Sequence, residues 1–311
     1  MTKIAIIDMG TNTFHLLIAE AGVNGYQIIY RDHVAVKIGM AGINEGIISE
    51  SGFNRALQAM QKFKNKMDQY PVSAVYAFGT SALRNAKNGR YLSEKIKSLT
   101  GISIHIISGD KEADFIYSGV KAALDLGKDV NLVMDIGAGS VEFIMADQQQ
   151  VFWKQSFEIG GQRLLEKFQK HDPILPEEIK ALDSFFEKSL APLLQACKKF
   201  KPGILVGSSG SFETLSEVYC IKNRIPQSFI GTETPLSKEG FFEIYKDLIR
   251  KNRNERIQMK GMIEMRVDMI VVTCCLIRFV LKKNKFDRIR VSTYSLKEGV
   301  LSHIAEGKGT F

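Results

Sequence analysis

The stretches Asp8-Met9-Gly10-Thr11-Asn12-Thr13 and Asp135-Ile136-Gly137-Ala138-Gly139-Ser140 are two copies of one pattern, 127 positions apart. Each follows a short apolar run and precedes a second run of strand character. Because glycine lets the chain approach a ligand closely, such a turn exposes backbone N–H groups and hydroxyls to a phosphate. The Asp at the end of the first run can hold a divalent metal or its waters against that phosphate. The repeat therefore predicts a duplicated fold whose two phosphate loops face each other across a cleft.

We call residues 10–13 the first loop and residues 137–140 the second loop. A third loop, Gly207-Ser208-Ser209-Gly210-Ser211, also follows an apolar run and leads into a helical pattern. A strand, a glycine-rich loop and a helix N-terminus together form a natural anion site. Turns of Gly and Ser also cap helices without binding a ligand, so the third loop is interpreted as a phosphate loop because of the other two.

The size and composition of the chain favour a two-domain globular protein. Its 311 residues exceed one typical core, and 45% apolar and 24% charged residues are ordinary for a soluble protein. No hydrophobic stretch of signal-peptide length precedes Asp8, and the longest apolar run, 269–281, is too short to span a bilayer and predicts a buried helix. The four cysteines lack metal-site spacing and the five histidines are scattered. We therefore expect a cytoplasmic protein without a membrane partner or a zinc site.

The net charge of +8 is unevenly distributed along the chain. Residues 238–290 hold 14 Lys and Arg against 7 Asp and Glu, which leaves +7 in that stretch, and residues 250–256 form its densest cluster. One interpretation is a set of solvated helix faces, and the other is a surface that collects a polyanion. No nucleic-acid recognition motif accompanies the charge, so nucleic acid is not expected as a partner.

Hydrophobic periodicity predicts strands and helices mixed in both halves of the chain, which is typical of α/β domains. The first half has strands near 4–8, 14–20, 26–38, 73–79 and 102–107 and helices near 51–68 and 110–124. The second half has strands near 129–135, 139–146, 149–158, 203–206 and 288–292 and helices near 161–170, 176–198, 210–219, 238–251, 264–284 and 295–305. We predict domains at 1–125 and 126–311 joined by a hinge at 126–129, with the last helix able to pack back on the first domain.

Three charged residues near these loops each have two interpretations. Glu112 begins a predicted helix, where it is either an acid stabilised by the helix dipole or a base that deprotonates a water attacking phosphorus. Arg84, just past a predicted strand, is either a surface residue or a bidentate phosphate clamp. Glu142 is either a cross-strand ion-pair partner or a second metal-directed carboxylate. Sequence position alone does not decide between these roles.

Five segments in family order carry a resemblance that covers nearly the whole chain. They are the first loop with Asp8, Gly79-Thr80-Ser81-Ala82-Leu83-Arg84, Ser108-Gly109-Asp110-Lys111-Glu112-Ala113, Asp135 to Glu142, and the third loop; Arg266-Val267-Asp268 and Leu296-Lys297-Glu298-Gly299 add to them. Together they resemble the exopolyphosphatase/guanosine pentaphosphate phosphatase family. The resemblance implies an α/β fold of two duplicated ribonuclease-H-like domains of the acetate-kinase/sugar-kinase/actin superfamily with an interdomain cleft.

The resemblance also implies a role for each site residue. Glu112 would be the general base, and Asp135, Glu142 and Asp8 would be carboxylates directed at Mg²⁺. The residues implied in phosphate binding are Asn12, Thr13, Arg84, Gly137, Ala138, Gly139, Ser140, Gly207, Ser208, Ser209, Gly210 and Ser211. Segment 135–142 departs from the family pattern at Ala138 and Val141, which stand where a Gly and a Thr are usual.

The implied activity is that of a Mg²⁺-dependent phosphohydrolase. Its substrate would be inorganic polyphosphate, from which it removes the terminal phosphate, or guanosine pentaphosphate, from which it removes the 5′ γ-phosphate. Two alternatives stay open: a superfamily kinase that phosphorylates a small acceptor, and a polyphosphate or nucleotide sensor with little turnover. The sequence does not decide between these substrates or between a monomer and a homodimer.

Overall fold

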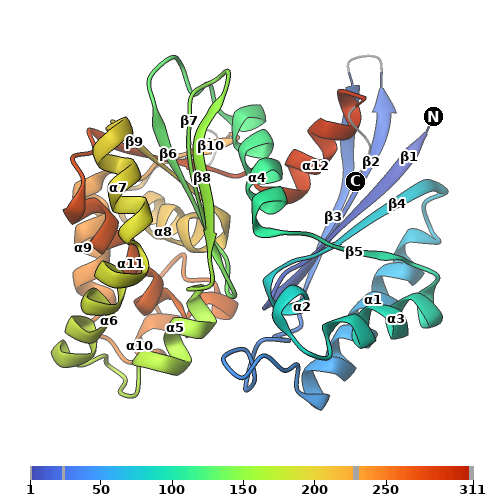
Figure 1. Ribbon diagram of the computed structural model, residues 1–311, viewed down its shortest axis with the longest axis horizontal. Helices are drawn as coiled ribbons and strands as arrows, with labels where there is room; N and C mark the ends of the chain where they lie inside the picture. The colour runs from blue at the N-terminus through green and yellow to red at the C-terminus, as the bar shows by residue number, and fades with distance from the viewer. Residues whose placement is uncertain (1, 23–24, 227–230, 308–311) are drawn as a thin grey trace. The chain divides into compact units, whose positions relative to one another are not determined.

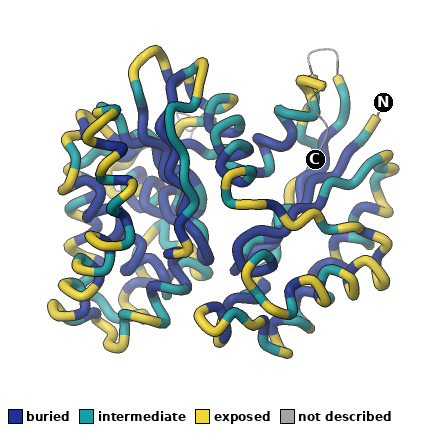
Figure 2. The backbone as a smooth tube through the Cα atoms, viewed as in Figure 1, coloured by how far each residue is buried: buried dark blue, intermediate teal, exposed yellow. Residues whose placement is uncertain are grey.

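The computed structural model describes residues 2–22, 25–226 and 231–307. The chain divides into two compact units: unit 1 contains Met1–Gly119 and Leu296–Phe311, and unit 2 contains Val120–Ser295. Each unit is built on one β-sheet with helices around it (Figure 1). Figure 2 shows the inner strands of each sheet mostly in dark blue, because their apolar side chains form the cores, and the outer turns of the helices in yellow.

Unit 1 contains a five-stranded sheet in the order β3-β2-β1-β4-β5. Its strands are β1 (Lys3–Met9), β2 (Thr13–Gly22), β3 (Gly25–Ala35), β4 (Val72–Gly79) and β5 (Ile104–Ile106). Strand β2 is antiparallel to both neighbours, whereas β1, β4 and β5 are parallel. The helices are α1 (Glu50–Met67), α2 (Ser81–Asn85), α3 (Gly89–Thr100), α4 (Gly109–Ala123) and α12 (Leu296–Ala305).

Unit 2 contains a six-stranded sheet in the order β10-β11-β9-β6-β7-β8. Its strands are β6 (Asn131–Ile136), β7 (Val141–Ala146), β8 (Val151–Phe157), β9 (Ile204–Ser208), β10 (Glu233–Thr234) and β11 (Arg288–Ser292). Its helices are α5 (Gly161–Phe168), α6 (Pro176–Ser189), α7 (Ala191–Phe200), α8 (Ser209–Lys222), α9 (Lys238–Leu248), α10 (Arg253–Ile257), η2 (Glu264–Arg266) and α11 (Ile270–Lys283). Every residue of α11 from Ile270 to Leu281 is buried, as predicted from the apolar run.

The two sheets confirm the predicted duplication. Without β10, the order β8-β7-β6-β9-β11 repeats β3-β2-β1-β4-β5, with the second strand antiparallel in both units. The first loop is closed by a hydrogen bond from Gly10 N to Thr13 O (3.1 Å), and the second by the equivalent bond from Gly137 N to Ser140 O (3.0 Å). This is the two-domain ribonuclease-H-like fold of the acetate-kinase/sugar-kinase/actin superfamily. The predicted cleft between the domains stays a prediction.

The repeat extends to the helix after the fifth strand. Glu112 lies six residues beyond the end of β5, and Glu298 lies six residues beyond the end of β11. The local sequences are Lys-Glu-Ala and Lys-Glu-Gly. Both glutamates are buried, and each accepts a hydrogen bond from an arginine, Arg84 or Arg31. Glu298 is therefore the counterpart of Glu112 in the repeat.

The observed units differ from the predicted domains at 1–125 and 126–311. The chain passes between the units within α4, and segment 126–129 belongs to unit 2, where Gln148 N donates to Gly127 O (2.9 Å). The last helix, α12, belongs to unit 1. A Cβ on Gly299 would lie only 1.7 Å from Phe115 O, so the absent side chain lets α12 pack closely on α4.

Helix bounds also differ where local packing overrides periodicity. The predicted helix at 264–284 begins instead at Ile270, after the short 3-10 turn η2.

Within the described ranges, no helix combines the length and the apolar character that a bilayer span requires. The four cysteines are free and buried.

Candidate active site

The predicted residues of unit 1 gather at one edge of its sheet. Strands β1, β4 and β5 are parallel, so their carboxyl ends meet at this edge. The first loop follows β1, α2 with Arg84 follows β4, and α4 with Glu112 follows β5. Two backbone hydrogen bonds link the ends of neighbouring strands at this edge. Thr80 N donates to Met9 O (3.4 Å), and Ile107 N donates to Gly79 O (3.1 Å).

The first loop presents backbone N–H groups in a defined direction. The carbonyl oxygens of Thr11 and Asn12 accept hydrogen bonds from the amides of segment 36–39, at 2.9 to 3.2 Å. In a planar trans peptide the carbonyl and the following N–H point in opposite directions. The amides of Asn12 and Thr13 therefore point away from that segment, as a phosphate-binding turn requires.

Glu112 and Arg84 form an ion pair within unit 1. Arg84 Nη1 lies 2.9 Å from Glu112 Oε2 and 3.0 Å from the carbonyl oxygen of Ile107. Glu112 is 7% exposed and lies in the first turn of α4. The structure therefore brings the predicted base and the predicted clamp together, and the guanidinium orients the carboxylate.

The backbone carbonyls of the second loop accept hydrogen bonds from residues at the start of α5. The carbonyl oxygens of Gly137, Ala138 and Gly139 accept bonds from the amides of residues 160–162, at 2.9 to 3.1 Å. Arg163 Nε adds a bond of 2.9 Å to Gly139 O. By the same peptide geometry, the three consecutive amides of residues 138–140 point away from α5, which is the arrangement that an anion-binding concavity requires.

Gly160 makes this arrangement sterically feasible. A Cβ at this position would lie 2.4 Å from the carbonyl carbon of Ala138, which is shorter than real contacts allow. The sequence motifs did not indicate that residues 160–163 belong to the site. The available signal was the Gly160-Gly161 pair directly before a helix, which is a common sign of close backbone approach.

Asp135 and Glu142 form the polar centre of unit 2. They are directly opposite each other on β6 and β7, and Ser208 on β9 and Ser156 on β8 continue the same row. Directly opposite residues have Cβ atoms about 4.5–5.5 Å apart and share a face of the sheet. Asp135 is 4% exposed and Glu142 is 1% exposed. Two carboxylates so close and so buried need compensating donors or a cation.

Serine hydroxyls supply the donors. Ser208, Ser209 and Ser295 donate to Asp135 at 2.6 to 2.8 Å, and Ser156 donates to Glu142 Oε1 at 2.7 Å. Ser209 has a φ of 68°, a left-handed conformation that non-glycine residues adopt at a cost. Two hydroxyls of the third loop are thus engaged by a carboxylate, which differs from the phosphate contacts expected of them. A phosphate role for the third loop stays a prediction.

Both glycines of the third loop lie in close contact with a side chain. A Cβ on Gly207 would lie 2.1 Å from the Phe212 ring, and a Cβ on Gly210 would lie 2.3 Å from the guanidinium carbon of Arg266. Burial lowers the pKa of Arg266, while the neighbouring Glu213 and Asp135 carboxylates act in the opposite direction. Arg266 therefore places a cation beside the third loop, a role that the sequence did not reveal.

The carboxylates of unit 2 fit a hard divalent cation. Mg²⁺ prefers oxygen ligands and is commonly held by one or two carboxylates together with waters and substrate phosphates. Asp135 and Glu142 match that donor set. Asp8 lies in unit 1, half-buried on β1 opposite His15. Among the described residues, no three His, Cys, Asp or Glu side chains gather into a metal-binding group. Binding of Mg²⁺ stays a prediction.

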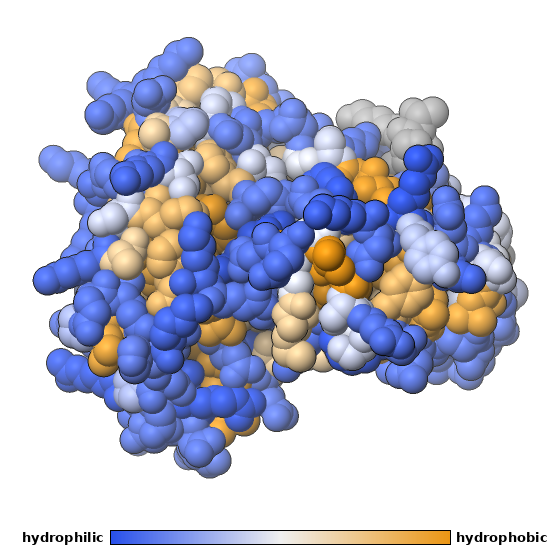
Figure 3. All heavy atoms as spheres, turned by 60° about the horizontal axis from the view of Figure 1, so that its bottom comes forward, coloured by the Kyte–Doolittle hydropathy of each residue, from blue (hydrophilic) through white to orange (hydrophobic). Residues whose placement is uncertain are grey.

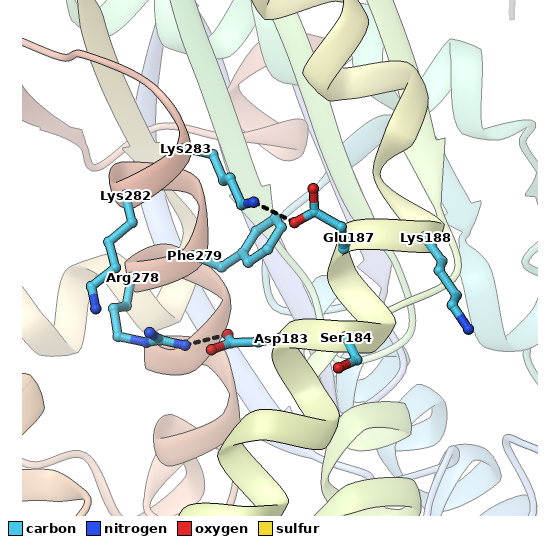
Figure 4. A pocket seen from close by; sticks show the side chains of 8 residues that line it. All are labelled: Asp183, Ser184, Glu187, Lys188, Arg278, Phe279, Lys282 and Lys283. Atoms are coloured by element: carbon cyan, nitrogen blue, oxygen red, sulfur yellow. Dashed lines mark hydrogen bonds and ion pairs between the residues drawn. The ribbon is translucent and has the colours of Figure 1, made fainter.

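The basic excess of 238–290 is partly neutralised by acids from elsewhere in unit 2. Arg256 is 2% exposed and pairs with Asp172 at 2.6 Å, and Arg290 pairs with Glu233 at 2.7 Å. A groove of about 560 Å³ between α6 and α11 shows two more such pairs, in which Arg278 points at Asp183 and Lys283 at Glu187 (Figure 4).

These pairs change the interpretation of the charge. Arg256 belongs to the fold rather than to a substrate-collecting surface, because neutralising it would leave Asp172 without its buried partner.

Hydrophilic residues predominate on the face drawn in Figure 3, with apolar residues scattered among them, as on most protein surfaces.

Comparison with known proteins agrees with the resemblance found in the sequence. The model of the Ppx/GppA phosphatase family matches residues 17–307. An exopolyphosphatase from Cytophaga hutchinsonii, known from its crystal structure, is 42% identical in sequence to this chain. The two structures superpose with a TM-score of 0.95, and the match covers 98% of each chain.

Two curated relatives are longer proteins. The bifunctional 3-dehydroquinate synthase/phosphatase of Fusobacterium nucleatum is 31% identical over 97% of this chain. The guanosine-5'-triphosphate,3'-diphosphate pyrophosphatase of Photobacterium profundum is 29% identical over 69% of it. The chain spans 46% and 43% of the lengths of these relatives. From the family match over residues 17–307 and the shared fold, we conclude that the chain belongs to the Ppx/GppA phosphatase family.

Proposed function

We propose that this protein is a phosphohydrolase that releases a terminal phosphate from inorganic polyphosphate, from guanosine pentaphosphate, or from both. Membership in a phosphatase family supports hydrolysis of a phosphate ester or anhydride. The names of its relatives supply the two candidate substrates, since one is an exopolyphosphatase and another a guanosine-5'-triphosphate,3'-diphosphate pyrophosphatase.

One observation carries the proposal: the second loop turns three consecutive amides outward beside two buried carboxylates. Amides in a row bind the oxygens of a phosphate, and carboxylates alone would repel it. The combination makes sense when a cation lies between the carboxylates and the substrate. When bound, Mg²⁺ would neutralise charge on the transferred phosphoryl group, and Asp135 and Glu142 would hold it.

The remaining roles belong to residues of unit 1. Glu112 accepts the proton of the attacking water, and Arg84 holds the Glu112 carboxylate in place through its 2.9 Å ion pair. The amides of the first loop bind phosphate oxygens in the same manner as those of the second. Phosphoryl transfer depends mostly on such positioning and electrostatic stabilisation, since the protein itself has little covalent chemistry to perform.

The deciding experiment measures orthophosphate release from polyphosphate and from guanosine pentaphosphate side by side with Mg²⁺. Release from either substrate without an added acceptor supports the phosphohydrolase. Phosphate transfer that requires a small-molecule acceptor would identify a kinase instead. Binding of either compound without turnover would identify a sensor.

A further inference from the structure

The carboxylate of Asp135 is held by hydroxyls from two separate segments of unit 2. Ser208 and Ser209 come from the third loop, whereas Ser295 follows β11 and donates to Asp135 Oδ2 at 2.6 Å. Ser209 and Ser295 also lie 3.3 Å apart, Oγ to Oγ. No sequence motif indicated a role for Ser295.

The hydrogen bonds are unequally divided between the two oxygens of Asp135. Ser208 and Ser295 both donate to Oδ2, whereas the single hydroxyl hydrogen of Ser209 is shared between Oδ1 and Oδ2, with its oxygen 2.8 Å from each. A carboxylate oxygen offers about two lone-pair directions, so Oδ2 is fully occupied and Oδ1 keeps acceptor capacity. The donors therefore fix the rotation of the carboxylate as well as satisfying its charge.

The turn that precedes Ser295 is fixed by its own hydrogen bonds. In the preceding turn Ser292 Oγ donates to Tyr294 O (2.8 Å), and Thr293 N donates to Thr232 O (3.0 Å). Leu296, the next residue, begins α12, which belongs to unit 1. The chain thus leaves unit 2 directly after the residue that bonds to Asp135.

We propose that Ser295 is a positioning residue: its hydroxyl holds the Asp135 carboxylate in the orientation that binds the divalent cation. Because Ser295 is the last residue of unit 2 before α12, the orientation of Asp135 then depends on the conformation of the chain where it leaves unit 2. The inference rests on the metal role proposed above for Asp135. It concerns the hydroxyl and the carboxylate alone, so it is tested on the protein without substrate.

The test is a titration with Mn²⁺, followed by electron paramagnetic resonance, which counts free ion directly. Ser295→Ala should raise the Mn²⁺ dissociation constant about tenfold, because removing a partner of a ligating group commonly costs about 10–100-fold in metal affinity. Ser295→Thr keeps the hydroxyl and should restore most of that affinity. The matched control is Ser216→Ala, since Ser216 lies in the same unit, is buried, and donates one bond, to Pro235 O at 2.7 Å.

Melting curves of all variants separate positioning from loss of stability. The inference is overturned if Ser295→Ala binds Mn²⁺ as tightly as the unchanged protein. It is also overturned if Ser216→Ala weakens binding equally at equal loss of stability, or if the unchanged protein binds no Mn²⁺. Weakened Mn²⁺ binding in Ser295→Ala together with no phosphate release from either substrate would sustain the positioning role and refute the proposed function.

Discussion

Replacing Glu112 by glutamine separates the catalytic role of this residue from its structural one. A glutamine keeps a carbonyl oxygen that accepts the 2.9 Å bond from Arg84 but cannot take a proton from water. A hydrogen bond to a charged partner contributes about 1.5–3 kcal/mol and a neutral one about 0.5–1.5 kcal/mol, so the expected loss of stability is about 1 kcal/mol. That loss is small against the roughly 5–15 kcal/mol of a typical folded domain.

The expected effect on the reaction is much larger. A general base contributes about 10²–10⁴-fold, which corresponds to roughly 3–5 kcal/mol in the activation barrier. We therefore expect Glu112→Gln to reduce kcat by that factor while substrate binding, measured by calorimetry, persists. Orthophosphate release under saturating Mg²⁺ and substrate measures the change.

The repeat provides a matched control in Glu298→Gln. Glu298 occupies the equivalent position, is buried, and accepts a 2.5 Å bond from Arg31. Its replacement should cost a similar amount of stability and leave kcat near that of the unchanged protein. Near-normal turnover in Glu112→Gln, or equal losses in both variants, would refute the assignment of Glu112 as the base.

Three further predictions follow from other parts of the structure. EDTA should abolish phosphate release, added Mg²⁺ should restore it, and Asp135→Ala should raise the Mg²⁺ concentration needed; full activity in EDTA would remove the metal from the reaction. Gly160→Ala should displace the second loop and weaken binding of a phosphate analogue, because its Cβ would lie 2.4 Å from that loop, whereas Gly231→Ala meets no atom within 4 Å and should bind normally. Hydrogen bonds from Arg290 lower the pKa of Glu233 below its ordinary 4.5, so this stabilisation is complete above pH 4.5 and is lost as the pH falls through the lowered value. Denaturant unfolding should accordingly show a smaller loss of stability on acidification in Glu233→Gln than in the unchanged protein, and equal losses would contradict this.

The distribution of charge shows where linear sequence misleads. The excess of +7 in residues 238–290 counts only neighbours along the chain. Asp172 and Glu233, which lie outside that stretch, pair with Arg256 and Arg290 within it. Charge that looks concentrated in the sequence is therefore partly cancelled in the folded protein.

The sequence by itself determined the repeated strand-loop-strand units and the fold that they build. An Asp at a strand end followed by glycine and hydroxyl residues is a local pattern, and local backbone preferences act over a few residues. The same locality makes the buried helix at 269–281 predictable, since an apolar run shows its burial directly. Family order then assigned roles to Glu112, Arg84 and Asp135.

Only the tertiary structure decided which partners these residues have. Arg84 is 28 positions from Glu112, and Ser295 is 160 positions from Asp135, so no local pattern links them. The same holds for Gly160 behind the second loop and for α12, whose place in unit 1 depends on a close contact of Gly299 with Phe115. Hydrogen bonds and steric fit are set by three-dimensional proximity, which sheet pairing creates between segments far apart in the chain.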